Sequence, residues 1–385
     1  MTELRPDNVG LDEDDRALRD LVRTFAEREV RPVVEAHEAA AKDPAAVYAG
    51  LAALGVAGIP FPEEFGGAGR PYRSYLLVIE ELAHVWVAAA VGLGVHTLVC
   101  DAVQRFAGPE LKEELLPALL AGERLGAYAL TESSSGSDAA SLQTRAVPDG
   151  GGYRLTGRKQ FCTRGAEADV LLVMARTGAE GAKGISAFLV DQGAPGFRPA
   201  KVEQKMGLRA SPTWELLFED CPVPAGRRLG AEGTGFSVAL TALDSGRLGI
   251  AAVAIGLAQA ALDAAVAYAQ GREQFGGPIA GLQGIEFLLA DMATGIAAGR
   301  ALYRRAADLK DAGAPFSTEA SMAKLFCSDV AMRVTIDAVQ VHGGYGYIED
   351  YPVERYLREA KALQIVEGTN QIQRLVIGRR LVARP

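Results

Sequence analysis

The segment Leu243–Leu262, LDSGRLGIAAVAIGLAQAAL, is rich in Ala, Leu and Ile, and its apolar character continues to Gln270. The apolar residues are spread nearly all the way round a helical projection and do not form a single stripe. A helix of this kind is typically buried, with other helices covering each of its sides. We therefore predict that Asp244–Gln270 is a buried helix within a helical bundle.

The sequence after this helix predicts the rest of the bundle. A second helix carries apolar residues mainly at four- and three-residue steps, as on a bundle seam: Ile285, Leu289, Met292, Ile296 and Tyr303. Ser317 can cap a third helix that ends at Gly343-Gly344. The predicted apolar side of this third helix consists of Met322, Leu325, Ile336 and Val339. Another short helix can begin at Pro352, so the C-terminal part is predicted to be helical throughout.

The sequence before the bundle has two parts that meet near Gly122. Upstream the pattern is helical, interrupted by a loop rich in Pro and Gly at Ile59–Tyr72. Downstream, short runs rich in Val, Leu and aromatic residues indicate strands: Ala127–Leu130, Tyr153–Thr156, Val170–Ala175, Ile185–Val190 and Trp214–Phe218. We predict an α+β chain with an N-terminal helical domain (1–122), a middle antiparallel β-domain (123–235) and a C-terminal helical bundle (236–385).

Composition narrows the class of protein. The chain has 385 residues, of which 49% are hydrophobic, and a net charge of −8 without a block of Lys or Arg, which argues against nucleic acid as the main partner. Four scattered cysteines fit reduced thiols, and four His residues without zinc-like spacing do not favour a metal site. The N-terminus lacks the layout of a signal peptide, and the longest apolar segments look too short or too interrupted to cross a bilayer. We expect a cytoplasmic protein.

The segment Leu363–Arg374, LQIVEGTNQIQR, holds the first candidate for chemistry. Glu367 directly follows an apolar Ile-Val pair, and Thr369 or Asn370 can cap the helix that comes next. A carboxylate beside apolar side chains loses solvation in its charged form, so its pKa rises into the range useful for moving protons. The alternative is an ordinary loop Glu in the first turn of a surface helix. Taken alone, the segment is compatible with both interpretations.

Two segments of the β-domain carry groups that suit a flat polar ligand. TESSSGSD, at Thr131–Asp138, places small hydroxyl residues and a Gly after a predicted strand, where backbone N–H groups are exposed. A solvated turn rich in Ser is the alternative. Phe161 and Thr163, two residues apart, point to the same side of an extended chain. They can equally be a core Phe beside a turn Thr.

Two segments of the bundle carry charged groups. Arg272 lies in GREQFG, at Gly271–Gly276, where it can pair with a phosphate that the flanking glycines allow to approach. An Arg that closes a helix C-terminus is the alternative. Asp244 and Arg247 are three residues apart and share a face of the buried helix, so an ion pair between them is also expected.

These motifs form an ordered series: TESSSGSD, FCTRG (Phe161–Gly165), MGLRASPT (Met206–Thr213), LDSGRLGIAAVAIGLAQAAL, GREQFG, AVQVHGGYGY (Ala338–Tyr347) and YPVERYLREAKALQIVEGTNQIQR (Tyr351–Arg374). Over essentially the whole chain they resemble the acyl-CoA dehydrogenase family, and are most similar to its short-chain and bacterial general branch. The resemblance implies a homotetramer, a dimer of dimers, with a C-terminal four-helix bundle. It implies non-covalent FAD between the β-domain and the bundle, completed by a neighbouring subunit. The implied reaction oxidises a short- or medium-chain acyl-CoA to the trans-2-enoyl-CoA and passes electrons to electron-transfer flavoprotein.

The resemblance also assigns roles to individual residues. Glu367 matches the catalytic base that removes the α-proton. Positions around the flavin ring are matched by Leu130, Thr131, Phe161 and Thr163, with the Thr163 hydroxyl near N5. Other FAD contacts are matched by Arg272, Gln274, Phe275, Gln340, Gly343, Gly344, Thr369 and Gln371, several of them from across the dimer. Positions that hold the CoA thioester are matched by Ser137, Asp244, Arg247 and Gly368.

The chain departs from the family pattern at three positions. Val366 replaces an aromatic residue that packs near the flavin, Arg164 replaces an Asn after the flavin-ring Thr, and Ser133 replaces a Pro. One family branch carries its base on the helix that Asp244 and Arg247 occupy here, but Glu367 in its EGT context favours the commoner arrangement. The helical regions 91–103 and 240–248 are expected to line the acyl pocket.

Three alternative functions remain open at this point. The chain can be a dehydrogenase of acyl groups on a carrier protein, a catalytically inactive scaffold relative, or a flavin oxidase that reacts directly with oxygen. Substrate preference, FAD uptake and peroxide release would separate them.

Overall fold

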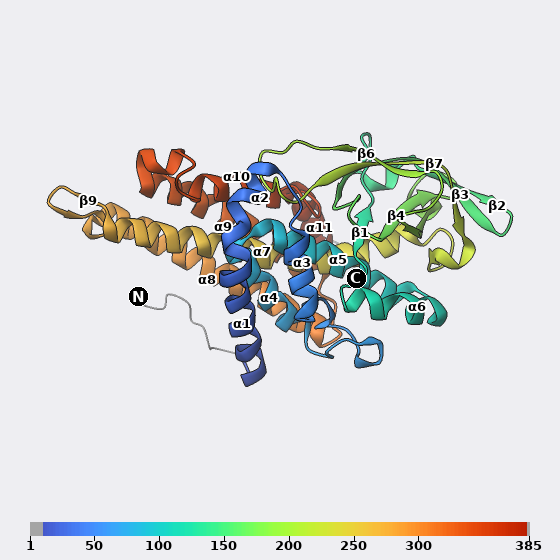
Figure 1. Ribbon diagram of the computed structural model, residues 1–385, viewed down its shortest axis with the longest axis horizontal. Helices are drawn as coiled ribbons and strands as arrows, with labels where there is room; N and C mark the ends of the chain where they lie inside the picture. The colour runs from blue at the N-terminus through green and yellow to red at the C-terminus, as the bar shows by residue number, and fades with distance from the viewer. Residues whose placement is uncertain (1–10, 383–385) are drawn as a thin grey trace.

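The structure is a computed structural model that describes residues 11–382 (Figure 1). The helical N-terminal part consists of α1 (Glu13–Phe25), α2 (Val34–Ala40), α3 (Ala45–Ala53), α4 (Tyr72–Val85), α5 (Val87–Phe106) and α6 (Pro109–Leu120). The C-terminal part consists of α7 (Gly235–Gly271), the short hairpin β9 (Glu273–Gln274) and β10 (Gly277–Pro278), α8 (Gln283–Asp311), α9 (Ser317–His342), α10 (Val353–Leu363) and α11 (Asn370–Val382). The predicted order of helical, β and helical parts is confirmed.

The middle part is one twisted sheet with the strand order β6-β7-β3-β2-β4-β5-β8. Its strands are β1 (Gly126–Ala129), β2 (Arg145–Asp149), β3 (Gly152–Thr163), β4 (Val170–Arg176), β5 (Ile185–Asp191), β6 (Phe197–Val202), β7 (Thr213–Pro224) and β8 (Arg228–Leu229). The prediction of a wholly antiparallel sheet is wrong for β1, which pairs in parallel with β4, and for the single parallel contact of β2 with β4. The parallel pair is possible because the chain crosses over through β2 and β3 between its two strands.

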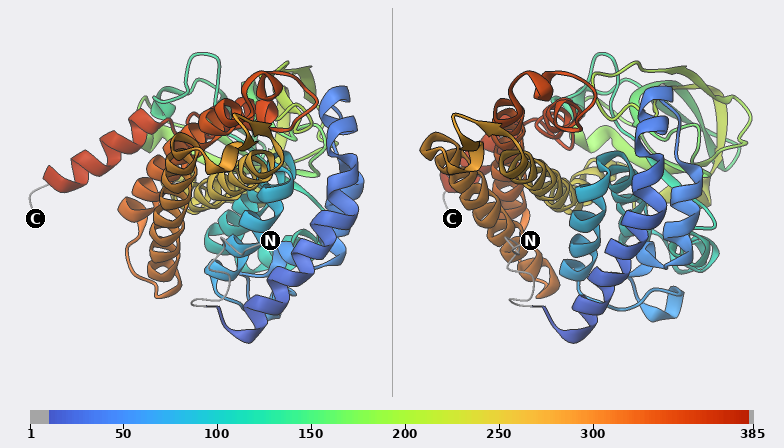
Figure 2. Two further views of the ribbon diagram at one scale, coloured as in Figure 1. Left: turned by 90° about the vertical axis from the view of Figure 1, so that its left-hand side faces the viewer. Right: turned by 60° about the vertical axis from the view of Figure 1, so that its left-hand side comes forward.

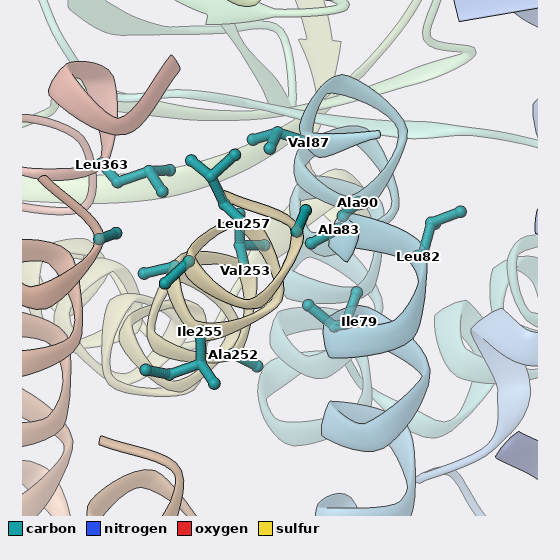
Figure 3. Packing of buried hydrophobic residues seen from close by; sticks show 14 of the residues in the cluster. Ile79, Leu82, Ala83, Val87, Ala90, Ala252, Val253, Ile255, Leu257 and Leu363 are labelled. Atoms are coloured by element: carbon teal, nitrogen blue, oxygen red, sulfur yellow. The ribbon is translucent and has the colours of Figure 1, made fainter. Parts of the chain in front are cut away.

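The long helix α7 is the centre of the molecule. Each residue from Arg247 to Leu262 is buried, and the helix packs against α4, α5, α8 and α9. Its small residues let neighbours approach closely: a side chain at Gly256 would place its first carbon 2.3 Å from the carbonyl oxygen of Glu80 on α4. Figure 3 shows Ala252, Val253, Ile255 and Leu257 of α7 packed between α4 and the C-terminal helices. The predicted buried helix is confirmed, although it starts earlier, at Gly235.

The predicted seam of α8 is confirmed, whereas the predicted apolar side of α9 is wrong. Met292, Ile296 and Tyr303 are buried on α8. On α9, Ile336 is 47% exposed, and the buried side consists instead mainly of small residues, among them Ala320, Ala323, Cys327, Ala331 and Ala338. Ser317 is the first residue of α9 rather than its cap, and its hydroxyl donates to Asp244 Oδ1 at 3.0 Å.

Contrary to the sequence-based expectation, α5 and α7 are long and apolar enough to cross a membrane by length and composition. In the most apolar window of each, 83% and 78% of the residues are buried against the rest of the protein. Core helices of this composition satisfy the same length and hydropathy criteria, so the two helices carry little weight as membrane spans.

The two ends of the molecule carry different elements. The β-domain lies at one end of the long axis and the β9–β10 hairpin at the opposite end (Figure 1). Helix α11 extends away from the body toward the C-terminus (Figure 2) and leaves Leu375, Leu381 and Val382 exposed.

Candidate functional site

The loop between α10 and α11 places Glu367 in an unusual backbone conformation. Glu367 has φ +56° and Gly368 has φ +86°, so two consecutive residues are left-handed. Only glycine adopts this conformation without steric cost, and for Glu367 the cost is about 1–2 kcal/mol. The Thr369 hydroxyl accepts a hydrogen bond from the Ile372 N–H at 3.3 Å, which confirms the predicted cap. Contacts elsewhere must therefore hold the loop in place.

The Glu367 carboxylate is desolvated, as the sequence predicts. Its Oε2 atom is buried and has no hydrogen-bond partner in the described part of the chain. Burial raises the pKa of Glu367 to about 7, although the positive charges of Arg247 and Lys324 act in the opposite direction. An acid with this pKa ionises near neutral pH and accepts a proton there.

Gly246 on α7 makes room for this carboxylate. A side chain at position 246 would place its first carbon 2.5 Å from Glu367 Oε2 and 3.0 Å from Oε1. Because a larger residue on α7 and the Glu367 carboxylate would occupy the same space, the helix does not supply an acid here. The structure thus leaves Glu367 as the carboxylate at this point.

Glu367 faces a narrow cavity of about 60 Å³ between α4, α5 and α7. Its lining is mainly apolar and small: Tyr72, Tyr75 and Ile79 from α4; Ala90, Val91, Gly94, Val95 and Leu98 from α5; Ser245, Gly246, Gly249, Ile250 and Val253 from α7; and Thr163, Val366 and Glu367. The expected contribution of 91–103 is largely correct, whereas on α7 the lining continues beyond 248. The α4 residues were not predicted, because their helical spacing reads equally well as ordinary core.

Asp244 and Arg247 form the expected ion pair at the start of the buried part of α7. Arg247 donates to Asp244 Oδ1 at 2.6 Å. Both side chains also contact α9, where the Ser317 hydroxyl donates to Asp244 at 3.0 Å and the Ser321 hydroxyl accepts from Arg247 at 3.5 Å. Burial raises the pKa of Asp244 and the positive charge of Arg247 opposes this. Arg247 Nε is buried without a partner in the described residues, which leaves one donor available near the carboxylate.

The flavin-ring candidates gather where β1 and β3 end. Thr163 lines the same cavity as Glu367, and Phe161 is 60% exposed with φ +58°. A buried ion pair holds these residues in place. Lys159 donates to Glu132 Oε1 at 2.8 Å and to the Leu130 carbonyl at 3.0 Å. Because Lys159 on β3 bonds to both the Leu130 carbonyl and the Glu132 side chain, it fixes the segment Leu130–Glu132 against β3.

The departure at Arg164 has a clear structural consequence. The side chain is buried, forms a two-pronged ion pair with Asp43 at 2.9 and 3.2 Å, and stacks on the Tyr48 ring at 3.6 Å. Arg164 therefore ties the turn after Thr163 to α3 of the N-terminal part. Of the other two departures, Val366 lines the cavity and Ser133 is exposed in a turn.

A second group of predicted residues lies at the other end of the bundle. An open hollow of about 460 Å³ includes Arg272, Gln274, Gly343 and Gly344 in its lining, whereas Phe275 nearby is 92% exposed and Gln340 is exposed on α9. Among residues 11–382, no atom beyond the chain neighbours of each glycine lies within 4 Å of the positions that side chains at Gly343 and Gly344 would take. A guanidinium beside open backbone suits a phosphate. Within one chain, the hairpin strand β9, which follows Arg272, lies at the opposite end of the long axis from β3, which ends at Thr163 (Figure 1).

The remaining predicted residues lie at the rim of these sites. Gly368 and Thr369 belong to the Glu367 loop, and Gln371 is exposed in the first turn of α11. Ser137 is exposed in the turn after β1. Lys324, whose buried ammonium contacts the loop from α9, was not predicted, because a lysine within a helix carries no local sign of burial.

Models of three domains match the chain: the acyl-CoA dehydrogenase N-terminal domain at residues 12–123, the middle domain at 127–221 and the C-terminal domain at 233–382. An acyl-CoA dehydrogenase of Bacillus subtilis (strain 168) is 48% identical over 367 residues, 95% of this chain and 97% of the relative. The solved structure of butyryl-CoA dehydrogenase from Megasphaera elsdenii superposes with a TM-score of 0.96 at 42% identity and covers 98% of this chain and all of the relative. A second solved chain comes from work on the electron transferring flavoprotein of Acidaminococcus fermentans and flavin-based electron bifurcation. It superposes with a TM-score of 0.96 at 46% identity and covers 98% of this chain and 100% of the solved chain.

Proposed function

The chain belongs to the acyl-CoA dehydrogenase family, and from this premise we propose that it dehydrogenates a short-chain saturated acyl-CoA to the trans-2-enoyl-CoA. The observation that carries the proposal is the desolvated Glu367 carboxylate facing an apolar cavity beside Gly246. The similarity to butyryl-CoA dehydrogenase and the narrowness of the cavity support a short acyl chain.

The residues of the chain supply the proton-transfer half of this reaction. An α-C–H beside a thioester is too weak an acid for a solvated carboxylate, so the raised pKa of Glu367 is needed to make the carboxylate a sufficiently strong base. The carbonyl oxygen gains negative charge as the proton leaves and requires a donor. In this family the N–H of the base residue itself is such a donor, and the left-handed Glu367 backbone leaves that N–H without a backbone acceptor in the described residues.

The two groups of predicted residues fit FAD, the cofactor of this family. Arg272 with the open glycines Gly343 and Gly344 suits the pyrophosphate, and exposed Phe161 with Thr163 suits the edge and face of a flavin ring. When bound there, FAD supplies the acceptor for the β-hydride. Thr163 would orient the ring, since it lines the same cavity as Glu367.

We also propose that two copies of the chain complete each FAD site. The β9–β10 hairpin and the β-domain lie at opposite ends of one chain, so a single copy does not surround one dinucleotide with both groups (Figure 1). The exposed apolar residues Phe275, Phe287 and Tyr347 near the hairpin are available to contact a second copy. We propose that the chain forms a homotetramer in the cytoplasm. Delivery of electrons to electron-transfer flavoprotein is supported by the likeness to the chain solved in work on the electron transferring flavoprotein of Acidaminococcus fermentans.

A substrate panel tests the proposed function. The FAD-loaded protein is assayed with straight and branched acyl-CoAs of increasing length, an artificial electron acceptor and, in parallel, the same acyl groups on a carrier protein. We expect the highest kcat/KM with short straight acyl-CoA. A preference for the carrier-bound acyl group, or release of peroxide at the rate of turnover, would replace this proposal with one of the alternatives.

A further inference from the structure

Lys324 is a buried charge close to the catalytic loop. It lies on α9 and is fully buried, a rare situation for a lysine that lacks an acidic partner. Its ammonium donates to the carbonyl oxygen of Gly368 at 2.9 Å and to Asn370 Oδ1 at 2.8 Å. Among residues 11–382 no carboxylate lies within ion-pair distance of its Nζ. Its hydrogen bonds thus go to neutral groups, and both acceptors belong to the segment that carries Glu367.

Gln373 holds the same segment from the other side. It is fully buried in the first turns of α11, and its Nε2 donates to the carbonyl oxygens of Glu367 at 3.1 Å and of Gly368 at 2.9 Å. The Gly368 carbonyl therefore receives two donors and the Glu367 carbonyl one. These bonds fix both peptide planes of the left-handed pair, which has no regular secondary structure to hold it.

The loop that carries Glu367 is also held against α9 through Asn370. The Asn370 side chain donates to Asp329 Oδ1 at 2.7 Å and to Ser328 Oγ at 3.0 Å, while its own oxygen accepts from Lys324. Lys324, Ser328 and Asp329 all lie on α9 within two turns of the helix. The loop is therefore held in a fixed position relative to a rigid element. A rigid support of this kind is what precise placement of a reacting group requires.

We propose that Lys324 and Gln373 are positioning residues for the proton abstraction, clamping the Glu367–Gly368 turn so that the carboxylate stays beside Gly246. This inference rests on the proposed role of Glu367 as the base. It goes beyond that role because neither residue reaches the cavity: both act through the backbone of the loop.

Charged residues on α7, on α9 and in the loop influence the Glu367 carboxylate and the Lys324 ammonium. Glu367 is influenced by Arg247 on α7 and Lys324 on α9, and it acts in turn on the phenols of Tyr72 and Tyr128. Lys324 is influenced by Glu367, Arg247 and Asp329, and burial lowers its pKa to about 7. Since Lys324 lowers the pKa of Glu367, replacing it with a neutral residue raises that pKa. The base is then ionised only at higher pH.

The experiment measures the α-proton transfer separately from hydride transfer. The FAD-loaded protein is incubated in D₂O with a 3-thia-acyl-CoA, in which sulfur replaces the β-carbon so that no β-hydride can leave. Deuterium incorporation at the α-carbon is followed by mass spectrometry as a function of pH. The variants are Lys324→Met and Gln373→Met, both near the native size. Thr335→Val is the control, because Thr335 is equally buried on α9 and its hydroxyl bonds only within that helix.

We expect both clamp variants to lose at least tenfold in exchange rate, since small displacements of a reacting group are costly. Lys324→Met should in addition move the apparent pKa of exchange upward by on the order of one pH unit, whereas Gln373→Met should leave it in place. Thr335→Val should match the wild type in both. Rates within twofold of wild type for the two clamp variants would overturn the inference.

The exchange experiment distinguishes failure of the proposed role of Glu367 from failure of the proposed clamp. If the wild type itself exchanges no α-hydrogen, the proposed role of Glu367 fails, independently of the clamp. If the wild type exchanges and the clamp variants do so equally well, only the clamp fails. Should Lys324→Met not yield FAD-loaded protein, Gln373→Met alone decides, because it removes two of the three bonds to the loop carbonyls without changing any charge.

Discussion

Two glutamates with raised pKa values, Glu359 within α10 and Glu367 in the loop after it, show what separates a desolvated acid from a catalytic one. Burial raises the pKa of Glu359 to about 8 against the opposing charge of Arg355, and the pKa of Glu367 to about 7. Both Glu359 oxygens lack hydrogen-bond partners in the described residues, and the nearest cation, Arg355 Nη1, is 3.7 Å away. By pKa alone Glu359 is the more perturbed residue.

The difference lies in what each carboxylate faces. Glu367 borders a cavity together with Gly246 and Thr163. Glu359 is enclosed: a side chain at Gly207 would place its first carbon 2.9 Å from the Glu359 nitrogen, so the loop containing Gly207 lies directly on α10. A raised pKa shows that a carboxylate has lost its contact with water. Such a carboxylate acts as a catalytic base only if a substrate can reach it. The following predictions test this comparison.

The largest effect is expected for Glu367→Gln. An amide does not accept the α-proton, so kcat should fall by roughly 10²–10⁴-fold, the usual contribution of a general base. FAD content should be unchanged, because the substitution keeps the size of the side chain and changes none of the residues proposed to hold FAD. Steady-state turnover and the flavin absorbance of the purified protein check both statements. Turnover comparable with wild type would mean that the base lies elsewhere.

A smaller loss is expected for Gly246→Ala, which tests the space that distinguishes the two acids. The added methyl group would lie 2.5 Å from Glu367 Oε2, so the flexible carboxylate must move. We expect kcat to fall on the order of 10- to 100-fold, in line with the cost of a misplaced reacting group. The melting temperature should change little, since the end of one side chain can shift without disturbing the core. Unimpaired turnover would show that the position of Oε2 is not critical.

Arg272→Ala tests the cofactor end, remote from both glutamates. Loss of one charge-assisted contact to a phosphate should weaken FAD binding by about tenfold, which corresponds to roughly 1.4 kcal/mol. Titration of the apoprotein with FAD measures the affinity. With FAD in excess, kcat should return toward the wild-type value, a recovery not expected of Glu367→Gln. An unchanged affinity would count against the assignment of Arg272.

The smallest effect on catalysis is expected for Glu359→Gln, the same substitution at the enclosed acid. Turnover should stay within about twofold of wild type. Stability should rise instead: the folded-state pKa of about 8 exceeds the unfolded value of 4.5, so the folded state holds a proton that the unfolded state releases, and the wild type loses stability as pH rises between these values. Unfolding at pH 8 should show a gain of about 1–3 kcal/mol over wild type, absent at pH 4. A large loss of kcat would remove the distinction drawn above.

Much of the site was predictable because its signals are local. The apolar residues beside Glu367 indicate desolvation, the Thr369 cap follows from residue type, and the i,i+3 spacing of Asp244 and Arg247 leads to their ion pair. The error on α9 has a different origin. Large apolar residues such as Ile336 suggested the core side, yet the close approach of α7 selects the alanine side. Ile336 is exposed, and Met322, Leu325 and Val339 are only partly buried.

By itself the sequence determined the family, the helical, β and helical order, the central position of α7 and the identity of the candidate base, because motifs, periodicity and residue chemistry are properties of neighbouring residues. Tertiary structure alone decided that Gly246 gives space to Glu367, that α4 lines the cavity and that Lys324 and Gln373 hold the loop. Except for the bonds from Gln373 to the loop five and six residues before it, each of these is a contact between segments far apart in the chain. Only the packing of whole helices fixes such distances, and no local pattern records them.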